Sequence, residues 1–421
     1  MNMKNTFDAY FNYRDNELHC DDVSLAKLAD EFNTPLYVYS KKALKERYAE
    51  IDSALGDVPH VICYSVKSNS NLSVLELMKD MGAGMDVVSG GELFRAIKIG
   101  VKPEKIVYAG VGKTGEEIEY ALIAGIRMFN CESFQEIEAI DYVAGQLGKN
   151  ASIAIRVNPD VDANTHHYIT TGKKENKFGI TVPLLMDNLD ILKKCKNITL
   201  KGIHAHIGSQ IVTVEPFENA LDRLMALIEN LKSDGFTEIN TVNLGGGFGI
   251  RYNDEELFDV NDWASIVKER VNGSGLTLII EPGRYIAGNS GALVTRVVYK
   301  KKSETKTFLI TDTGMHHLIR PSLYGAFQHI RNCSLREGSE VVDVVGPICE
   351  SGDFFARDRE ISLSQQGDLL AVLSAGAYGM VMASRYNSHP MPAEVMVNED
   401  GTSSLIRRRE SYDDIIRHEV I

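Results

Sequence analysis

The middle of the chain alternates short β-branched runs with amphipathic stretches, and this repetition constrains the fold more than any other feature. Residues 61–66 and 153–157 predict strands, whereas residues 72–81 and 217–231 predict helices. Repeated strand–helix units favour parallel strands with helices outside them. A closed (β/α)8 barrel is the simplest α/β architecture, and an open doubly wound sheet is the alternative. The predicted strands of this part are residues 36–39, 61–66, 85–89, 106–109, 127–130, 153–157, 202–206, 241–244 and 276–280.

The pattern changes after about residue 285, where strand-like runs follow one another with few helical stretches between them. Such a series predicts a second, mostly antiparallel β domain that resembles a sandwich or a barrel. Because 421 residues are ample for two domains, we predict a TIM-like barrel at residues 31–285 and a β domain formed by residues 1–30 and 286–421. The predicted strands of the second domain are residues 294–300, 307–311, 340–345, 368–374 and 393–397.

Composition restricts the partners and the compartment. The chain carries 58 acidic and 45 basic residues, a net charge of −13, and an acidic surface disfavours binding to nucleic acid. Its six cysteines are scattered without a C-x-x-C pair, which predicts free thiols in a reducing compartment. We recognise no signal peptide and no apolar run near the roughly 20 residues of a membrane span. We therefore expect a cytoplasmic protein with neither nucleic acid nor membrane as a partner.

Polar or glycine-rich segments lie at or near the ends of five predicted strands. They are Lys67, Asp86, residues 206–210, the glycine run 245–247 and residues 281–284. In barrels of parallel strands, active groups gather at the C-terminal ends of the strands. We therefore predict one site at this rim that contains all five segments.

Three of these segments suit an aldehyde cofactor that carries a phosphate. A lysine in a partly dry pocket can form a Schiff base with an aldehyde, although Lys67 could instead reach solvent. The glycines let backbone N–H groups and a following helix N-terminus approach a phosphate, although a tight turn needs glycine too. Glu281 can hold a protonated pyridine nitrogen and Arg284 can clamp an anion, although the two could simply form a salt bridge.

His204 and His206 are separated by one residue, so on a strand both would point to the same face. No acidic residue follows at a familiar ligand spacing, which disfavours a metal site. A histidine stacked on a cofactor ring fits the predicted site better, and a histidine packed in the core is the alternative.

Three further segments in the second half offer reactive groups. Residues 320–324 provide Arg320 and Tyr324, residues 346–353 place Cys349 beside Glu350, and residues 376–379 place Tyr378 between glycines. A protonated thiol can act as a proton donor. Taken alone, each segment is more typical of a loop than of a site.

Eight strings together resemble the diaminopimelate decarboxylase family, fold-type-III pyridoxal-phosphate enzymes of the alanine-racemase-like barrel class. The resemblance runs from about residue 35 to residue 397, and the strings occur in the family's order. They are YSVKSN from Tyr64, DVVSGGEL from Asp86, HIGSQ from His206, GGG from Gly245, EPGR from Glu281, RPSLYGA from Arg320, CESGD from Cys349 and GAYG from Gly376.

The resemblance implies a lyase of lysine biosynthesis that uses pyridoxal 5'-phosphate to convert meso-2,6-diaminopimelate into L-lysine and carbon dioxide. By this resemblance Lys67 would form the Schiff base, His206 would stack on the cofactor ring and Glu281 would pair with the pyridine nitrogen. The expected cofactor-binding residues are Lys67, Asp86, His206, Ser209, Gly247, Glu281, Pro282, Gly283, Arg284 and Tyr378.

The resemblance also implies a homodimer with shared sites and an amino-acid substrate. The distal carboxylate of the substrate would bind Arg284 and Arg320, and its distal ammonium group would bind Glu350. Cys349 of the partner subunit would protonate the carbanion left by carbon dioxide. The expected catalytic residues are Lys67 and Cys349, and the expected substrate-binding residues are Arg284, Arg320, Tyr324, Glu350 and Tyr378.

One stretch departs from the family, and rival functions remain. His389 and Met391 stand where the family often has arginines, which bears on the substrate and the interface but not on the cofactor. The rivals are a decarboxylase of another basic amino acid or carboxylated polyamine, an amino-acid racemase, and a non-catalytic regulator. Glu350 after the cysteine differs from the aspartate of ornithine-type relatives, and the CESGD string is not typical of racemases.

Overall fold

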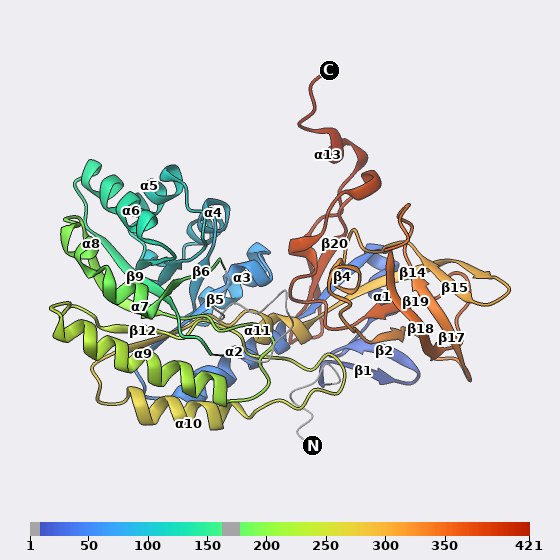
Figure 1. The fold of residues 1–421 in the computed structure, drawn as a ribbon. Helices are drawn as coiled ribbons and strands as arrows, with labels where there is room; N and C mark the ends of the chain where they lie inside the picture. Colours follow the sequence, from blue (N-terminus) through green and yellow to red (C-terminus); the bar gives the residue numbers. More distant parts are fainter. Residues whose placement is uncertain (1–8, 162–176) are drawn as a thin grey trace. The chain divides into compact units, whose positions relative to one another are not determined.

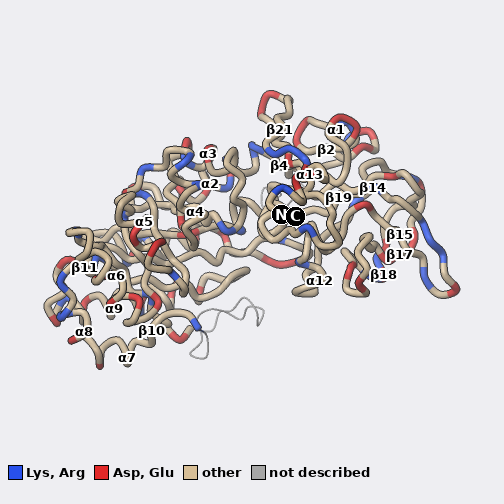
Figure 2. Tube along the Cα trace, turned by 90° about the horizontal axis from the view of Figure 1, so that it is seen from above, with Lys and Arg blue, Asp and Glu red and all other residues tan. Residues whose placement is uncertain are grey.

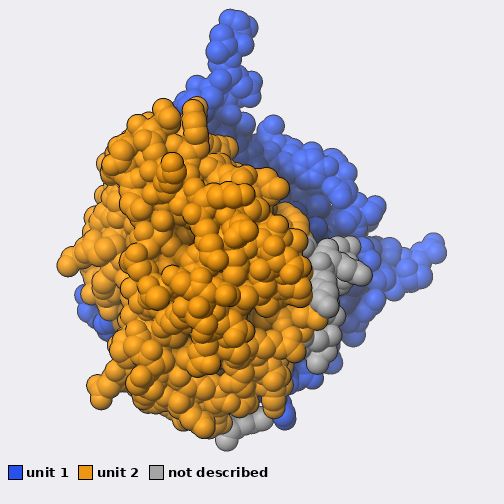
Figure 3. Space-filling view, turned by 60° about the vertical axis from the view of Figure 1, so that its left-hand side comes forward, with its two compact units in different colours: residues 1–47, 250–256, 284–421 blue, residues 48–249, 257–283 orange. Residues whose placement is uncertain are grey.

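The structure is a computed structural model that describes residues 9–161 and 177–421 (Figure 1). The chain forms two compact units, coloured separately in Figure 3. The barrel unit comprises residues 48–249 and 257–283, and the β unit comprises residues 1–47, 250–256 and 284–421.

Eight parallel strands close the barrel unit into a ring. Each strand pairs with the next in the order β5, β6, β7, β8, β9, β11, β12 and β13, and β13 pairs with β5 again. The closed barrel is therefore confirmed, and the open doubly wound sheet is excluded. A short strand, β10 (Ile180–Thr181), pairs with β9 outside the ring. The ring strands are β5 (His60–Ser65), β6 (Gly84–Val87), β7 (Ile106–Tyr108), β8 (Met128–Cys131), β9 (Ala151–Asn158), β11 (Ile198–His204), β12 (Thr241–Asn243) and β13 (Thr277–Ile280).

Helices follow the barrel strands as predicted, and side-chain caps fix where several of them begin. Ser89, two residues after β6, accepts a hydrogen bond from the Glu92 N–H and caps α4. Thr114 and Glu117 form a capping box at α5, which ends at the left-handed Gly125. Lysine, arginine and acidic residues are interspersed along the helices of the unit (Figure 2). The helices are α3 (Leu72–Asp80), α4 (Gly90–Lys98), α5 (Gly115–Ala124), α6 (Phe134–Gln146), α7 (Val182–Asp187), α8 (Leu189–Lys194), α9 (Glu215–Ser233) and α10 (Val260–Val271).

The interior of the barrel changes from apolar to polar toward the C-terminal ends of its strands. Cys63, Val107, Met128, Ala154 and Ile279 form a buried apolar cluster. Further along β8, β11, β12 and the end of β13 lie four buried polar side chains, Asn130, His204, Asn243 and Glu281. Since burying an unpaired polar group costs free energy, this polar layer identifies the C-terminal end of the barrel as the place to look for a site.

The β unit is a mostly antiparallel sheet in the order β18-β17-β15-β14-β4-β20-β21, and β19 joins β14 to β16. Among the strand pairs that the structure describes in this unit, β4–β20 and β15–β17 are parallel and the others are antiparallel. Its strands are β4 (Leu36–Ser40), β14 (Gly291–Lys302), β15 (Thr307–Thr311), β16 (Ile330–Asn332), β17 (Ser339–Val345), β18 (Phe354–Ser362), β19 (Leu369–Val372), β20 (Ala393–Val397) and β21 (Ser403–Arg407).

The first described residues of the chain also belong to this unit. The strands β1 (Phe11–Arg14), β2 (Glu17–Cys20) and β3 (Val23–Ser24) form a small sheet, and α1 (Leu25–Phe32) follows. Phe11, Leu18 and Leu25 are fully buried in one core cluster with residues of β4, β14, β19 and β20. Each such side chain contributes about 1.5–3 kcal/mol by burial, which ties the first segment to the sheet.

The prediction that residues 36–39 form a barrel strand is wrong. The strand found there, β4, pairs antiparallel with β14 and parallel with β20 in the β unit. All five of its residues are buried, and a strand buried on both faces reads as a continuous apolar run in either kind of sheet. The compact units consequently divide after Arg47, inside α2 (Lys41–Leu55), and not after residue 30.

None of the helices within residues 9–161 and 177–421 has both the length and the apolar character that crossing a bilayer requires.

Candidate active site

All five predicted segments lie at the C-terminal end of the barrel strands. Lys67 lies in a short 3-10 turn (Val66–Ser68) that follows β5, and its Nζ atom lies 2.5 Å from Oδ2 of Asp86 on β6. The carboxylate of Asp86 is fully buried, whereas the Lys67 side chain is 36% exposed. Asp86 therefore holds Lys67 in place, while the amine remains accessible from solvent. A lysine that binds a ligand needs both properties.

Ser65 connects this pair to the end of β13. Its Oγ atom lies 2.7 Å from Oδ2 of Asp86 and 2.9 Å from the backbone oxygen of Glu281. Burial raises the pKa of Asp86, and Lys67, which lowers it, compensates only in part. The Oδ1 atom of Asp86 is buried and has no hydrogen-bond partner among the described residues, so this acid can still accept a donor from a ligand.

Glu281 is held from two sides by amides. Its Oε1 atom accepts hydrogen bonds from Asn130 on β8 (2.9 Å) and from Asn243 on β12 (2.7 Å). Its Oε2 atom lies 3.4 Å from Nε2 of His204, the last residue of β11. Burial alone raises the pKa of Glu281, but His204, Lys67 and Asn243 outweigh it and the net pKa falls below the usual range. The carboxylate is therefore ionised although it is buried.

His204 and His206 have different environments. His206 lies two residues beyond the end of β11, where its Nδ1 atom accepts a hydrogen bond from the Gly246 N–H (3.1 Å). Burial, with Arg156 and Lys67 nearby, lowers the pKa of His206 well below its ordinary value, so the imidazole is neutral with its proton on Nε2. No group of three or more metal-ligating side chains occurs in the described parts of the chain.

The glycines near these groups let the loops pack more closely than any other residue would allow. A Cβ atom on Gly245 would lie 2.7 Å from Ala205 O, and one on Gly247 would lie 2.6 Å from Gly208 O. Gly283 is equally restricted, since its Cβ would lie 2.9 Å from Cβ of Ser65 and of Ser68. Pro282 lies in the loop of Gly283, which follows β13, and Ser209 lies in the loop after β11 that contains Ala205 and Gly208.

The predicted helix N-terminus after the glycine run is wrong. Residues 248–259 contain no helix, and α10 begins only at Val260. Phe248 instead forms a bridge with Ile211, so the run is held by a neighbouring loop. Any phosphate there would be bound by loop N–H groups without the field of a helix.

The β unit contains a second cluster of predicted site residues, which surround Tyr252. They are Arg284, Arg320, Tyr324 and Tyr378. Tyr252 itself was not predicted from the sequence. Nη1 of Arg284 donates a hydrogen bond to the hydroxyl oxygen of Tyr252 (2.6 Å). The centre of the Tyr252 ring lies 4.7 Å from the guanidinium carbon of Arg320. The Arg284 guanidinium also lies over Tyr378 (4.8 Å), and that of Arg320 lies 5.9 Å from the Tyr324 ring centre. Both arginines are 6% exposed.

One cation of this arginine–tyrosine cluster, Arg320, has no described acidic residue beside it to balance its charge. Arg320 forms no ion pair with any described residue, and its Nε atom is buried without a hydrogen-bond partner among them. Burial lowers the pKa of Arg320 relative to its ordinary value. Because a buried cation is costly unless it is paired, the cluster is suited to bind an anion.

Cys349 and Glu350 lie on an exposed loop of the β unit. The Cys349 N–H donates to Oδ1 of Asn387 (3.1 Å), and interaction with Glu350 raises the pKa of Tyr386. Asp353 fixes the other end of the loop by accepting hydrogen bonds from the N–H groups of Met315 (2.6 Å) and Ile348 (2.7 Å). The Cys349 thiol is thus exposed to solvent on a loop whose backbone is held by Asn387 and Asp353.

The two departures from the family lie next to this loop. The ring of His389 lies 4.7 Å from that of His316, which lies 3.8 Å from that of His317. Burial lowers the pKa of His316 to about 3 and that of His317 to about 2. The backbone of Met391 donates to Oε2 of Glu410 (3.2 Å). Both residues therefore take part in packing and hydrogen bonding within the β unit.

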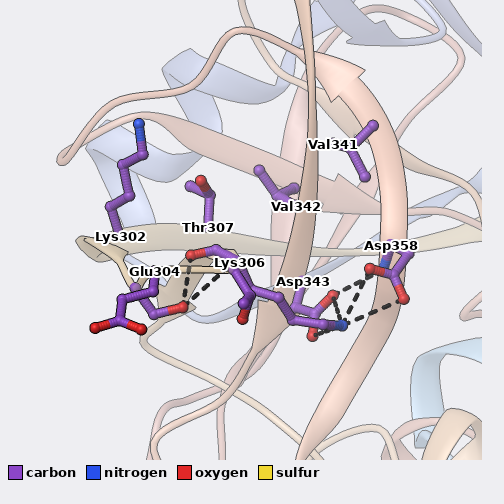
Figure 4. A pocket seen from close by; sticks show the side chains of 10 residues that line it. Lys302, Glu304, Lys306, Thr307, Val341, Val342, Asp343 and Asp358 are labelled. Carbon is purple, nitrogen blue, oxygen red and sulfur yellow. Dashed lines mark hydrogen bonds and ion pairs between the residues drawn. The ribbon is translucent and has the colours of Figure 1, made fainter.

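A cavity of about 230 Å³ in the β unit is a poorer candidate (Figure 4). It lies beside the β14–β15 hairpin, and Lys306 crosses it to reach Asp343 (2.8 Å) and Asp358 (3.0 Å). Lys306 is already neutralised by these two carboxylates, so it offers a ligand no unmatched charge.

Comparison with known proteins identifies the class. The family model "Pyridoxal-dependent decarboxylase, pyridoxal binding domain" matches residues 41–288. The chain belongs to the pyridoxal-dependent decarboxylases, enzymes that use pyridoxal phosphate to release carbon dioxide from amino acids. The residues described above fit this cofactor, because they supply a lysine on a buried acid, an ionised carboxylate and a glycine run whose loop N–H groups can approach a phosphate.

Within this class the chain belongs to the diaminopimelate decarboxylase family. It is 47% identical over 418 residues to the diaminopimelate decarboxylase of Aquifex aeolicus, with 99% of each chain covered. The Haemophilus influenzae enzyme is 46% identical and covers 96% of this chain and 98% of its own. The Helicobacter pylori enzyme, solved in complex with L-lysine, is 40% identical, covers 94% and 98% of the two chains and superposes with a TM-score of 0.89.

Three residues at these sites escaped the sequence analysis: Asn130, Asn243 and Tyr252. Asn130 ends the predicted strand 127–130, and Asn243 lies at the end of another. A polar residue that ends an apolar barrel strand is itself a signal, and it could have identified both. Tyr252 lies in a segment without secondary structure, where no pattern indicated it.

Proposed function

We propose that this pyridoxal-phosphate enzyme converts meso-2,6-diaminopimelate into L-lysine and carbon dioxide, with Lys67 and Glu281 as its central residues. One observation carries the proposal: a solvent-accessible lysine on a buried acid lies at the same end of one barrel as a buried, ionised glutamate. The bound cofactor supplies an electron sink for the electrons released when carbon dioxide leaves.

The barrel residues would hold the cofactor. Lys67 Nζ would bind the aldehyde carbon, and Asp86 would keep the proton of this amine nearby. The neutral His206 would lie against the ring, because an uncharged imidazole does not repel the protonated pyridine that Glu281 stabilises. Ser209, Gly247, Pro282 and Gly283 would surround the phosphate with loop N–H and hydroxyl donors, and Arg284 and Tyr378 would complete its binding.

The arginine–tyrosine cluster would bind the carboxylate that the product retains. Arg320 is the buried cation with no counter-charge among the described residues, and Arg284 and Tyr324 adjoin it. Glu350, on its exposed loop, would bind the distal ammonium group. The known relative solved with L-lysine bound supports a product of this kind.

We further propose a cytoplasmic homodimer in which Cys349 acts in the site of the other subunit. The thiol is exposed on its own subunit, and all six cysteines are free, as a reducing compartment requires. Cys349 would deliver a proton from its Sγ atom to the carbon that lost carbon dioxide.

The experiment that tests the function measures carbon dioxide release from meso-diaminopimelate with and without added pyridoxal phosphate. Lys67→Ala should abolish both turnover and the absorbance band of the lysine-bound cofactor. Lys98→Ala, at an exposed position of α4, is the matched control and should retain both. Parallel assays with ornithine, arginine and lysine identify a rival decarboxylase, and diaminopimelate that is inert with the cofactor bound would refute the substrate.

The shared site can be tested by mixing two inactive variants. Lys67→Ala and Cys349→Ala subunits, unfolded together and refolded, should form hybrids with one intact site, and roughly a quarter of wild-type activity should return in a random mixture of dimers. No recovery, with hybrids shown to form, would mean that Lys67 and Cys349 act within one chain.

A further inference from the structure

The carboxylate of Glu281 is bound by two amides that come from different parts of the ring. Asn243 lies on β12, the neighbour of β13, whereas Asn130 lies on β8, which is separated from β13 by β5, β6 and β7. The Asn130–Glu281 hydrogen bond (2.9 Å) therefore spans the barrel. Both asparagines are fully buried, and both donate to the same oxygen, Oε1.

A second contact fixes the orientation of the Asn243 amide, and another anchors the backbone of Asn130. The Oδ1 atom of Asn243 accepts a hydrogen bond from the Gly245 N–H (2.8 Å), so its Nδ2 must face Glu281. The backbone oxygen of Asn130 accepts from Nζ of Lys113 (2.9 Å), and Lys113 is itself bound to Glu136 (2.5 Å). The Asn243 amide is thereby anchored on the side away from the carboxylate, whereas Asn130 is anchored through its backbone and its Oδ1 atom has no hydrogen-bond partner among the described residues.

We propose that Asn130 and Asn243 are positioning residues that keep Glu281 ionised and fix the plane of its carboxylate. This inference rests on the proposed role of Glu281 opposite the pyridine nitrogen of the cofactor. Two donors on Oε1 leave Oε2 as the oxygen that faces His204 and a ligand. Neither asparagine needs to touch the reacting atoms, since each acts through Glu281.

The electrostatic surroundings show why two donors are needed. Burial favours the neutral form of a carboxylic acid, and donors and cations oppose it. Without an amide donor, the remaining charges include both signs, because Asp86 opposes ionisation of Glu281 and Lys67 favours it. The ionisable groups near Glu281 are His204 of β11, His206 of the loop after it, Lys67, Asp86 of β6 and Cys63 of β5.

The direct test measures the pKa of Glu281 in the cofactor-free protein by carbon-13 NMR of labelled glutamate, with Glu281→Gln used to assign the signal. The wild-type carboxylate should stay ionised down to the lowest pH at which the protein remains folded. Asn130→Leu and Asn243→Leu should each raise this pKa by at least one unit, a tenfold change in the ionisation equilibrium. Cys131→Ala, the next buried residue of β8, removes packing but no donor and should leave the pKa unchanged.

A second variant guards against misfolding of the leucine variants. Asn130→Asp keeps the shape of the side chain and places a second acid against Glu281, so one carboxyl of the pair should titrate well above its ordinary pKa. The affinity for pyridoxal phosphate should fall about tenfold in Asn130→Leu and remain unchanged in Cys131→Ala. An unshifted Glu281 signal in both leucine variants would overturn the inference.

The two proposals fail in different ways. If the wild-type protein forms no lysine-bound cofactor, the proposed function is wrong whatever the NMR titration shows. If the cofactor binds and turns over but the Glu281 pKa is insensitive to both asparagines, only the positioning role is wrong.

Discussion

The C-terminal end of the barrel, which we call the barrel mouth, contains the polar residues Lys67, Asp86, His204 and Glu281. Their charges are neutralised in a different way from those of the arginine–tyrosine cluster. In the barrel, Lys67 is paired with Asp86, and Glu281 is held by two amides and lies near His204. In the β unit, Arg284 and Arg320 are packed against tyrosine rings, and Arg320 has no acidic partner among the described residues. A cation over an aromatic ring is stabilised by about 0.5–2 kcal/mol, less than a buried charge needs.

This difference indicates a division of labour. A site whose charges are compensated before the ligand arrives can hold a cofactor and tune its electronics, because its geometry does not depend on the substrate. A buried cation without a counter-ion gains most when an anionic group arrives, so its contribution is to binding and selection.

The largest effect should come from the barrel. Glu281→Ala should lower kcat for diaminopimelate about a thousandfold, because the ring nitrogen of the cofactor loses the carboxylate that pairs with it. This loss corresponds to about 4 kcal/mol of transition-state stabilisation. The absorbance band of the lysine-bound cofactor should persist, since Lys67 is untouched. The measurement is steady-state kinetics together with the spectrum, and a smaller loss than in Arg320→Leu would reverse the division of labour.

The next effect should come from the arginine–tyrosine cluster. Arg320→Leu should raise KM about a hundredfold and change kcat little, because it removes an interaction made equally by bound substrate and transition state. The KM of Arg320→Lys should lie between those of the wild type and Arg320→Leu, since a lysine keeps the charge but loses the planar donor geometry. The exposed Arg336→Leu is the control. A fall in kcat at unchanged KM would place Arg320 in the chemical step instead.

A smaller effect concerns the loop that carries Cys349 and Glu350. Asn387→Ala removes the acceptor of the Cys349 N–H and should lower kcat about tenfold, the cost of about one hydrogen bond. Asn387→Asp keeps an acceptor and should restore most of the rate. Labelling of the Cys349 thiol should remain complete in both variants. Equal losses in Ala and Asp would show that Asn387 serves the loop through its backbone, whose φ is +53°.

The sequence predicted the barrel half of the molecule better than the other half, for a physical reason. Parallel strands bring their C-terminal ends to one rim, so Lys67, Asp86, His206, Gly247 and Glu281 could be grouped from their positions after strands. In the β unit the cluster comes from a loop at Tyr252, the start of a short helix at Arg284 and a turn at Tyr378. No periodicity relates such segments, so only the family resemblance placed Arg320 and Tyr378 among the site residues.

The misplaced strand β4 illustrates the same limit. Residues 36–40 are LYVYS, all buried, and an alternating pattern that would reveal a one-sided sheet is absent. Membership in one sheet or the other is decided by pairing partners about 250 and 350 residues away, β14 and β20. The short edge strand β21 was missed because none of its residues is fully buried and three of its five residues are polar, which weakens the strand pattern.

The smallest effect concerns stability, and it tests whether charge compensation in the barrel mouth is complete. Glu92, at the start of α4, accepts a hydrogen bond from the Val88 N–H (2.8 Å), yet burial raises its pKa to about 7. The folded protein therefore binds this proton more tightly than the unfolded chain, whose glutamates titrate near pH 4.3. It follows that the free energy of unfolding falls as pH rises from about 4.5 to 7 and then levels off.

Glu92→Gln cannot ionise and keeps an oxygen for Val88, so it should remove this contribution. The difference in unfolding free energy between the variant and the wild type, measured by urea denaturation, should grow in favour of the variant up to about pH 7. Glu119→Gln, at an exposed position of α5, is the control and should show no such trend. A difference that does not depend on pH would mean that the charge of Glu92 is as well compensated as that of Glu281, which stays ionised although it is buried.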